Sequence, residues 1–245
     1  TQTFDIYEGG SGPALVLLHG LGGTWHIWKP VIPLLESRYR VIVPTLPGHC
    51  NGPALPAGSK ASVPLLAETL IEALRARGIH TAHVAGNSLG GWLSLELLRR
   101  GFARSVTAFS PAGAWDSLAD YRKIETPFRV IFFLLPLLML LTWLFLGFAG
   151  VRRALLRQSM EHGERLSKDE LRMMLHGMRG AKSLPDLLDW MGTGGPIAAL
   201  DVGSTPAAIV WGECDQVIPF ERYGRPMLNR VPGAEPRTIA GVGHV

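Results

Sequence analysis

The stretch that decides the fold is GNSLGG, residues 86–91. It follows a short apolar segment at residues 83–85 and precedes residues 89–100, whose apolar side chains have helical spacing. Small residues on both sides of Ser88 permit a sharp turn from a strand into a helix, and such a turn holds a serine up at the carboxyl edge of a sheet. Ser88 would also suit an ordinary helix N-cap. Its position between a buried strand and a helix favours a nucleophile.

Strands and helices alternate on both sides of this turn. Continuous apolar runs predict strands at residues 14–18, 39–43, 105–109 and 207–211. Apolar residues at helical spacing predict helices at residues 25–36 and 64–76. Such alternation indicates an α/β fold with a mostly parallel, doubly wound sheet. The pattern breaks at residues 113–201, where helical segments follow one another. We therefore predict a core of residues 1–112 and 202–245, with residues 113–201 inserted as a helical cap.

A carboxylate follows the predicted strand at residues 207–211. In the segment WGECD, Asp215 would project from the carboxyl end of that strand, the edge at which Ser88 is expected. A buried carboxylate at this place can accept the N–H of an imidazole. Glu213 remains an alternative because it lies close by, whereas Asp201 precedes the strand and is expected at the opposite end.

A histidine stands almost at the end of the sequence, in GVGH at residues 241–244. The glycines allow a flexible turn that could carry the imidazole of His244 over Ser88, where it would take the serine proton and return it to a leaving group. The plainer interpretation is a solvated histidine near a chain end. The sequence lacks an initiator Met and stops at Val245, so we expect a C-terminal helix to be missing.

A glycine-rich turn, HGLGG at residues 19–23, ends the first strong strand and should face Ser88 across the sheet. The backbone N–H groups of Leu21 and Leu89 could then form an oxyanion hole, which stabilises the charge that develops on a substrate oxygen. The alternative is a plain glycine turn.

The segments HGLGG, GNSLGG, WGECDQVIP and GVGH together resemble the capped α/β-hydrolase superfamily over nearly the whole chain. The resemblance implies the α/β-hydrolase fold and a triad of Ser88, Asp215 and His244, in the chain order usual for that fold. It implies no metal and no organic cofactor. It also sets aside the epoxide hydrolase and haloalkane dehalogenase branches, which use an aspartate where this sequence has Ser88.

Composition points away from several other classes of protein. The net charge is +4, but Lys and Arg are spread without a basic block, so no nucleic-acid partner is expected. Cys50 and Cys214 lie in neither a CxxC nor a Cys/His pattern, which indicates neither a disulfide framework nor a zinc site. Residues 1–12 lack the basic and apolar regions of a secretory signal, so we expect a cytoplasmic location.

The predicted cap contains a segment, residues 130–150, without any charged residue. Its length alone would allow a transmembrane helix. Pro136 argues against one, as does the need for both halves of the core to join one sheet. We predict instead that apolar side chains line a pocket for a lipophilic ester or lactone, with contributions from Trp25, Phe132, Phe133, Met139, Trp143 and Phe148.

The same segment leaves other partners open. It could close a homodimer, because large exposed apolar patches usually find a partner. It could also make a peripheral membrane contact, with Arg152, Arg153 and Arg157 on anionic headgroups, although solvated surface arginines are the simpler interpretation.

The leading functional hypothesis is a serine hydrolase that cleaves a carboxylic ester or lactone through an acyl-enzyme. Carbon–carbon bond hydrolysis or acyl transfer could use the same triad. The non-enzymatic hypothesis is a catalytically inactive protein that has kept the fold and binds a ligand.

Overall fold

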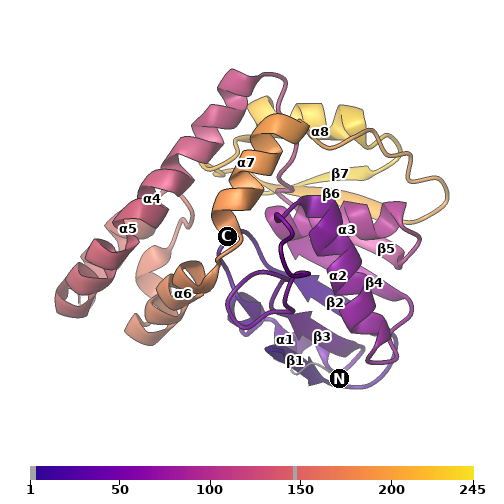
Figure 1. Cartoon of the computed structure of the whole chain (residues 1–245), viewed down its shortest axis with the longest axis horizontal. Coiled ribbons are helices and arrows are strands. Elements are labelled where there is room, and N and C mark those ends of the chain that lie inside the picture. The colour runs from indigo at the N-terminus through magenta and orange to yellow at the C-terminus, as the bar shows by residue number, and fades with distance from the viewer. Residues whose placement is uncertain (1–3, 146–147) are drawn as a thin grey trace.

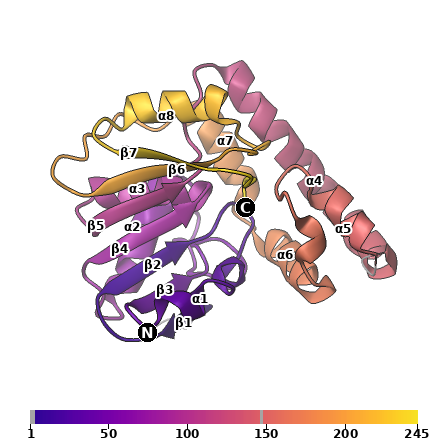
Figure 2. The same cartoon turned by 180° about the vertical axis from the view of Figure 1, so that it is seen from behind.

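The computed structural model describes residues 4–145 and 148–245, with the backbone alone for residues 141–145. Seven strands form one sheet in the order β1-β3-β2-β4-β5-β6-β7 (Figure 1, Figure 2). Only the β1–β3 pair is antiparallel among the described strands. The sheet is therefore mostly parallel, as predicted. The strands are β1 (Ile6–Gly9), β2 (Ala14–Leu18), β3 (Arg40–Pro44), β4 (Ala82–Asn87), β5 (Ala103–Phe109), β6 (Ala207–Gly212) and β7 (Glu235–Ile239).

Helices cover both faces of this sheet. They are the 3-10 helix η1 (Trp25–Trp28), α1 (Ile32–Leu35), α2 (Val63–Arg75), α3 (Leu89–Arg99), the π-helix η3 (Phe220–Gly224) and α8 (Arg225–Arg230). The single helix predicted at residues 25–36 is wrong, because η1 and α1 are separate. Pro30 explains the break, since proline has no backbone N–H to donate to the preceding turn.

The alternation of side chains in β2 shows how the two layers form. Val16 and Leu18 belong to the main core, together with the apolar residues of α2 and α3, whereas Leu17 packs with Ile32 on the other face. All four side chains are at least 97% buried. Successive strand residues point to opposite faces, so a parallel strand covered on both sides is apolar throughout.

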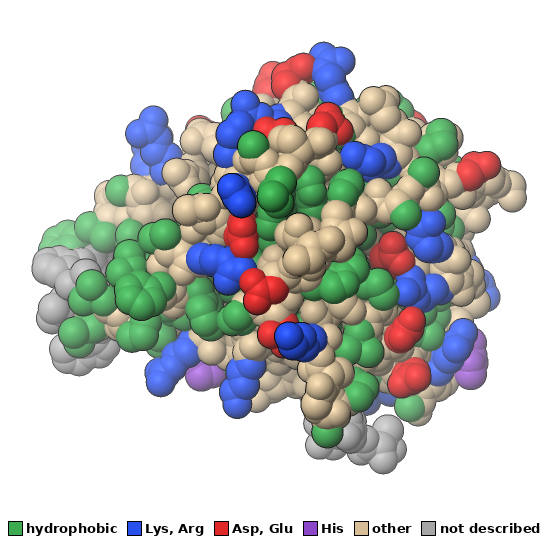
Figure 3. Space-filling model, turned by 45° about the horizontal axis from the view of Figure 1, so that its top comes forward, with side chains coloured by type: hydrophobic (Ala, Val, Ile, Leu, Met, Phe, Trp, Pro, Cys, Tyr) green, Lys and Arg blue, Asp and Glu red, His purple; other side chains and the backbone are tan. Residues whose placement is uncertain are grey.

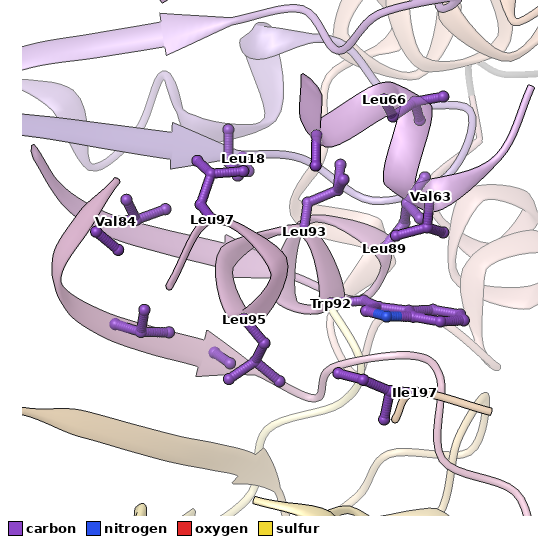
Figure 4. Packing of buried hydrophobic residues seen from close by; sticks show 14 of the residues in the cluster. Leu18, Val63, Leu66, Val84, Leu89, Trp92, Leu93, Leu95, Leu97 and Ile197 are labelled. Carbon is purple, nitrogen blue, oxygen red and sulfur yellow. The ribbon is translucent and has the colours of Figure 1, made fainter. Parts of the chain in front are cut away.

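The helix that follows Ser88 is buried over its whole first half. Every residue from 89 to 97 in α3 is buried, and Leu93 and Leu97 lie near Leu18 of the sheet, while Trp92 extends the same core toward Ile197 (Figure 4). Burying one such side chain contributes about 1.5–3 kcal/mol to folding. The start of α3, and with it the position of Ser88, is therefore held by the main core.

Between β5 and β6 the described residues form helices and no strand. These helices are α4 (Leu118–Phe145), α5 (Ala149–Leu156), the 3-10 helix η2 (Gly163–Arg165), α6 (Lys168–Gly180) and α7 (Leu184–Gly194). In both views α4 projects from the sheet, while α7 stands closer to it (Figure 1, Figure 2). The main core continues into this region through Trp115, Tyr121, Leu187 and Met191. The base of the helical region thus shares one core with the sheet.

None of the helices, as far as their residues are described, combines the length and the hydropathy needed to cross a membrane.

Candidate active site

Ser88 occupies a strained turn between β4 and α3. Its φ is 56° and its ψ is −115°, and its N–H donates to Phe109 O at 2.9 Å. Few residues other than glycine adopt positive φ, and those that do cluster at functional sites. Although Ser88 stands at the N-cap position, its side chain makes no capping hydrogen bond. The hydroxyl is therefore not used to begin the helix.

The glycines around Ser88 are required by close backbone contacts. A Cβ at position 86 would lie 2.2 Å from Gly90 O, and one at position 90 would lie 2.2 Å from Leu18 O. Real Cβ atoms do not approach an oxygen so closely, so both positions need glycine. The GNSLGG pattern is thus explained by how tightly the turn packs on β2.

Asp215 and His244 form a buried pair at the same edge of the sheet. Asp215 follows β6, and its Oδ2 accepts a hydrogen bond from His244 Nδ1 at 2.7 Å. The other carboxylate oxygen, Oδ1, accepts the backbone N–H groups of Val217 at 3.0 Å and Ile218 at 2.9 Å. Both side chains are more than 90% buried. The carboxylate is therefore fixed, and it fixes the tautomer of the imidazole, leaving Nε2 without a proton when the ring is neutral.

The two rival carboxylates lie elsewhere. Glu213 is exposed and accepts the backbone N–H of Gly241 at 2.9 Å. Asp201 is also exposed and accepts the N–H of Gly203 at 2.9 Å. Asp215 is the one of the three that contacts the imidazole.

The backbone of His244 is held by the residue next to the candidate nucleophile. Asn87 Nδ2 donates to His244 O at 2.9 Å, in a buried contact between residues 157 positions apart in the sequence. No other donor to this carbonyl occurs among the described residues. Asn87 therefore links the elbow of Ser88 to the loop that carries the imidazole, a role that its place in GNSLGG does not reveal.

The turn at residues 19–23 lies directly beside Ser88. A Cβ at position 20 would be 3.3 Å from Ser88 Cβ. Neither Leu21 N–H nor Leu89 N–H makes a hydrogen bond to another described residue. An oxyanion hole requires N–H donors that are free in this way.

His19 locks this turn in place. Its Nδ1 donates to Gly20 O at 2.8 Å, and its Nε2 accepts the N–H of Leu46 at 2.9 Å. Burial, together with the neighbouring His49, lowers the pKa of His19 to about 3. The ring is therefore neutral at pH 7, as its roles as one donor and one acceptor require.

The cap helices lie against the loops of the site. Val245 N–H donates to Ser159 O at 2.9 Å, and a Cβ at position 22 would be 3.3 Å from Met178 Cγ of α6. The segment after α5 and the helix α6 thus border the loops that carry His244 and Leu21.

The predicted pocket residues occupy different places. Trp25 stacks on His26 and donates its indole N–H to Asp5 at 2.9 Å. Phe132 packs against the cluster of Leu184 and Leu188. Met139 is half-buried, whereas Phe133 is 82% and Phe148 is 65% exposed. The side chain of Trp143 lies outside the described residues. The two exposed phenylalanines lack the cover that the walls of an enclosed pocket have.

Two cavities border the cap, and Ser88 lines neither. One of about 290 Å³ is lined by Asp5, Thr24, His26, Cys50, Asn51, Arg172, Met173 and His176. The other, of about 260 Å³, lies between α4 and α7 and is lined by Arg129, Phe132, Phe133, Leu184, Pro185 and Leu188. Among the described residues, no group of three or more His, Cys, Asp and Glu side chains is arranged to hold a metal ion.

Comparison with known proteins gives the family and the fold. A family model described as "Alpha/beta hydrolase family" matches residues 15–245. The chain belongs to the alpha/beta hydrolase family. The fold of this hydrolase also resembles the structure of a thermophilic esterase from Thermogutta terrifontis, with a TM-score of 0.72 and 18% identity, covering 98% of this chain and 86% of that one.

Curated relatives of this hydrolase differ in their named activities. Epoxide hydrolase EphH of Mycobacterium tuberculosis is 30% identical over 74% of this chain and 86% of its own length. Pimeloyl-[acyl-carrier protein] methyl ester esterase of Aeromonas hydrophila is 28% identical over 99% of this chain and 92% of its own. Another relative, the magnesium-chelatase 30 kDa subunit of Rhodobacter capsulatus, is 42% identical, but the match spans 35% of this chain and 30% of that protein. The epoxide hydrolase and the esterase are both named as hydrolases, but they cleave different bonds.

Proposed function

We propose that this hydrolase cleaves a carboxylic ester or lactone by attack of Ser88 Oγ on the carbonyl carbon. The observation that carries the proposal is the buried hydrogen bond of 2.7 Å between His244 and Asp215, at the edge where Ser88 is held at positive φ. A serine at such a turn and a histidine bonded to a carboxylate are the parts of a hydrolytic triad.

Each member of the triad has one task. Because His244 Nδ1 donates to Asp215, its Nε2 is free to accept the proton of Ser88 during attack. The same proton then goes to the leaving alcohol, and the carbonyl carbon remains bound to Ser88 as an ester. Water attacks this acyl-enzyme, with His244 as general base, and releases the acid and the serine. Asp215 stays ionised and stabilises the imidazolium in both steps.

The oxyanion formed in each attack needs donors that are already in place. The N–H groups of Leu21 and Leu89 make no hydrogen bond to another described residue and flank Ser88. A donor of this kind lowers the barrier by about 3–4 kcal/mol. His19 supports the turn that presents Leu21, through its bonds to Gly20 O and Leu46 N–H.

The residue at position 88 favours carbonyl substrates over epoxides. A serine that opened an epoxide would be left as an ether, which water does not cleave readily, whereas a serine that attacks a carbonyl is left as an ester. One relative is named an epoxide hydrolase, and another, matching 99% of this chain, is named a methyl ester esterase. Of these two activities, a serine nucleophile supports ester hydrolysis. The apolar side chains near the cap support a lipophilic acyl group or alcohol.

The test is hydrolysis of p-nitrophenyl esters from acetate to long acyl chains. We expect the wild type to prefer longer chains and Ser88→Ala to lose at least about 10⁴-fold in kcat. Ser59→Ala, at an exposed serine in a loop, is the matched control and should keep full activity. Activity that survives in Ser88→Ala would refute the assignment. Turnover of carbon–carbon substrates, or transfer to an alcohol, without ester hydrolysis would replace it.

A further inference from the structure

A stripe of exposed apolar side chains runs along one face of α4. Its members recur at intervals of three or four residues, the spacing of one helix face. They are Val130, Phe133, Leu134, Leu137 and Leu140. Phe148 and Leu155 extend the exposed apolar surface toward α5. Figure 3 shows hydrophobic side chains gathered on the projecting part of the molecule that carries these helices.

The stripe is longer than an ordinary exposed apolar patch, and the residues next to it on the helix are also apolar. Leu137 is 52% and Leu140 is 63% exposed, although each has helix neighbours that are also apolar. At a rise of 1.5 Å per residue, the ten steps from 130 to 140 extend over about 15 Å. Single exposed leucines need no explanation, but a continuous apolar patch marks a contact surface.

Arginines follow this surface in the sequence, on α5 and at its end, and the Nε of Arg153 lies 3.9 Å from Oε2 of Glu164. Residues 130–160 contain three arginines, Arg152, Arg153 and Arg157, and no Asp or Glu. Arg153 and Arg157 are exposed on the helix α5 and at its end. An apolar helix face bordered by arginines is complementary to a bilayer with anionic headgroups.

We propose that the stripe on α4, with the arginines of α5, docks this hydrolase on an anionic lipid bilayer. The helix α4 would lie in the interface with its apolar face among the upper acyl chains, and Arg153 and Arg157 would reach the headgroups. This mode requires no membrane-spanning helix. A second copy of the chain is the alternative occupant, and the oligomeric state of the wild type and of the test pair described below distinguishes the two.

The experiment measures binding of the full chain to sedimented vesicles. One vesicle type is phosphatidylcholine alone, and the other is an equal mixture of phosphatidylcholine and phosphatidylglycerol. The test pair is Leu137→Gln with Leu140→Gln, since glutamine keeps helix propensity close to that of leucine. The control pair is Leu34→Gln with Leu118→Gln, which are 74% and 51% exposed outside the stripe. Circular dichroism checks that all variants are folded.

We expect the wild type to bind the anionic vesicles more tightly than the neutral ones. The test pair should lower the partition coefficient by at least about tenfold, and the control pair should leave it unchanged. Replacing Arg153 and Arg157 by glutamine should cost about fivefold each on anionic vesicles and little on neutral ones.

Three results would overturn the proposal: no binding to anionic vesicles, equal losses in the test and control pairs, or a wild-type dimer that the test pair converts to monomer without any vesicle binding. The last result would make the stripe a contact between two copies. Vesicle binding involves no reaction, so its outcome is independent of the ester hydrolysis proposed above.

Discussion

Replacing Asn87 by alanine tests whether the buried amide positions the catalytic histidine. The change removes the donor that holds His244 O at 2.9 Å and leaves Ser88, Asp215 and His244 themselves intact. His244 would keep its bond to Asp215, but its backbone carbonyl would lose its one donor among the described residues. We therefore expect an enzyme that binds substrate normally and turns it over slowly.

The magnitude follows from the burial of that carbonyl. A buried acceptor left without a partner costs about 1–3 kcal/mol. If this cost falls on the geometry that His244 needs in the transition state, kcat drops by about 5-fold to 150-fold, because 1.4 kcal/mol corresponds to a factor of ten. The same loss would lower the melting temperature by about 2–4 °C per kcal/mol for a chain of this size.

The assay separates positioning from simple destabilisation. Asn87→Ala and the isosteric Asn87→Asp, which lacks the donor, are compared on one p-nitrophenyl ester, with rates normalised to the folded fraction. Both variants should lower kcat while KM stays nearly constant. A drop in melting temperature with kcat per folded molecule unchanged would refute the reasoning, since Asn87 would then only stabilise the fold.

Three further perturbations follow from the same structure. Asp215→Asn should lower kcat by about 10³–10⁴-fold, measured with the same ester, because the imidazole loses its buried carboxylate; a loss below tenfold would point to another acid. Burial lowers the pKa of His19 to about 3 and that of His49 to about 4. As pH falls below 6.5, these two histidines therefore become protonated in the unfolded chain before they do in the folded one. Denaturant titrations should therefore show the free energy of unfolding falling from pH 6.5 to 4, by up to about 1.4 kcal/mol per pH unit for each histidine, and a flat profile would contradict their burial as neutral rings. Gly90→Ala should destabilise the fold by about 3 kcal/mol or more, because its Cβ would lie 2.2 Å from Leu18 O, whereas Gly150→Ala meets nothing within 4 Å and should be neutral or stabilising by up to about 1 kcal/mol.

Much of the fold can be predicted because its strands are buried on both faces. A run such as residues 14–18 is apolar throughout, and only a covered parallel strand needs that. The turn at Ser88 could be predicted because a tight backbone excludes side chains at positions 86 and 90, which leaves a visible glycine pattern. The helix predicted at residues 25–36 failed because apolar spacing was given more weight than Pro30.

Long-range contacts and the burial of individual side chains could not be predicted in the same way. The bond between Asn87 and His244 joins residues 157 apart, and no local spacing encodes it. Hydropathy identified the apolar segment of the cap but not its surroundings: Phe148 was expected in the pocket and is 65% exposed, and the cavity that Phe133 lines does not include Ser88. The buried fraction of a side chain depends on which elements pack over it, and the arrangement of those elements depends on the topology of the whole chain.

The central claim, that Ser88 is the nucleophile activated by His244, is tested most directly by labelling with a fluorophosphonate and locating the adduct by peptide mass spectrometry. The account predicts one phosphonyl group on Ser88 in the wild type and almost none in His244→Ala under the same conditions. A label on another residue, or equal labelling of Ser88 without His244, would contradict it.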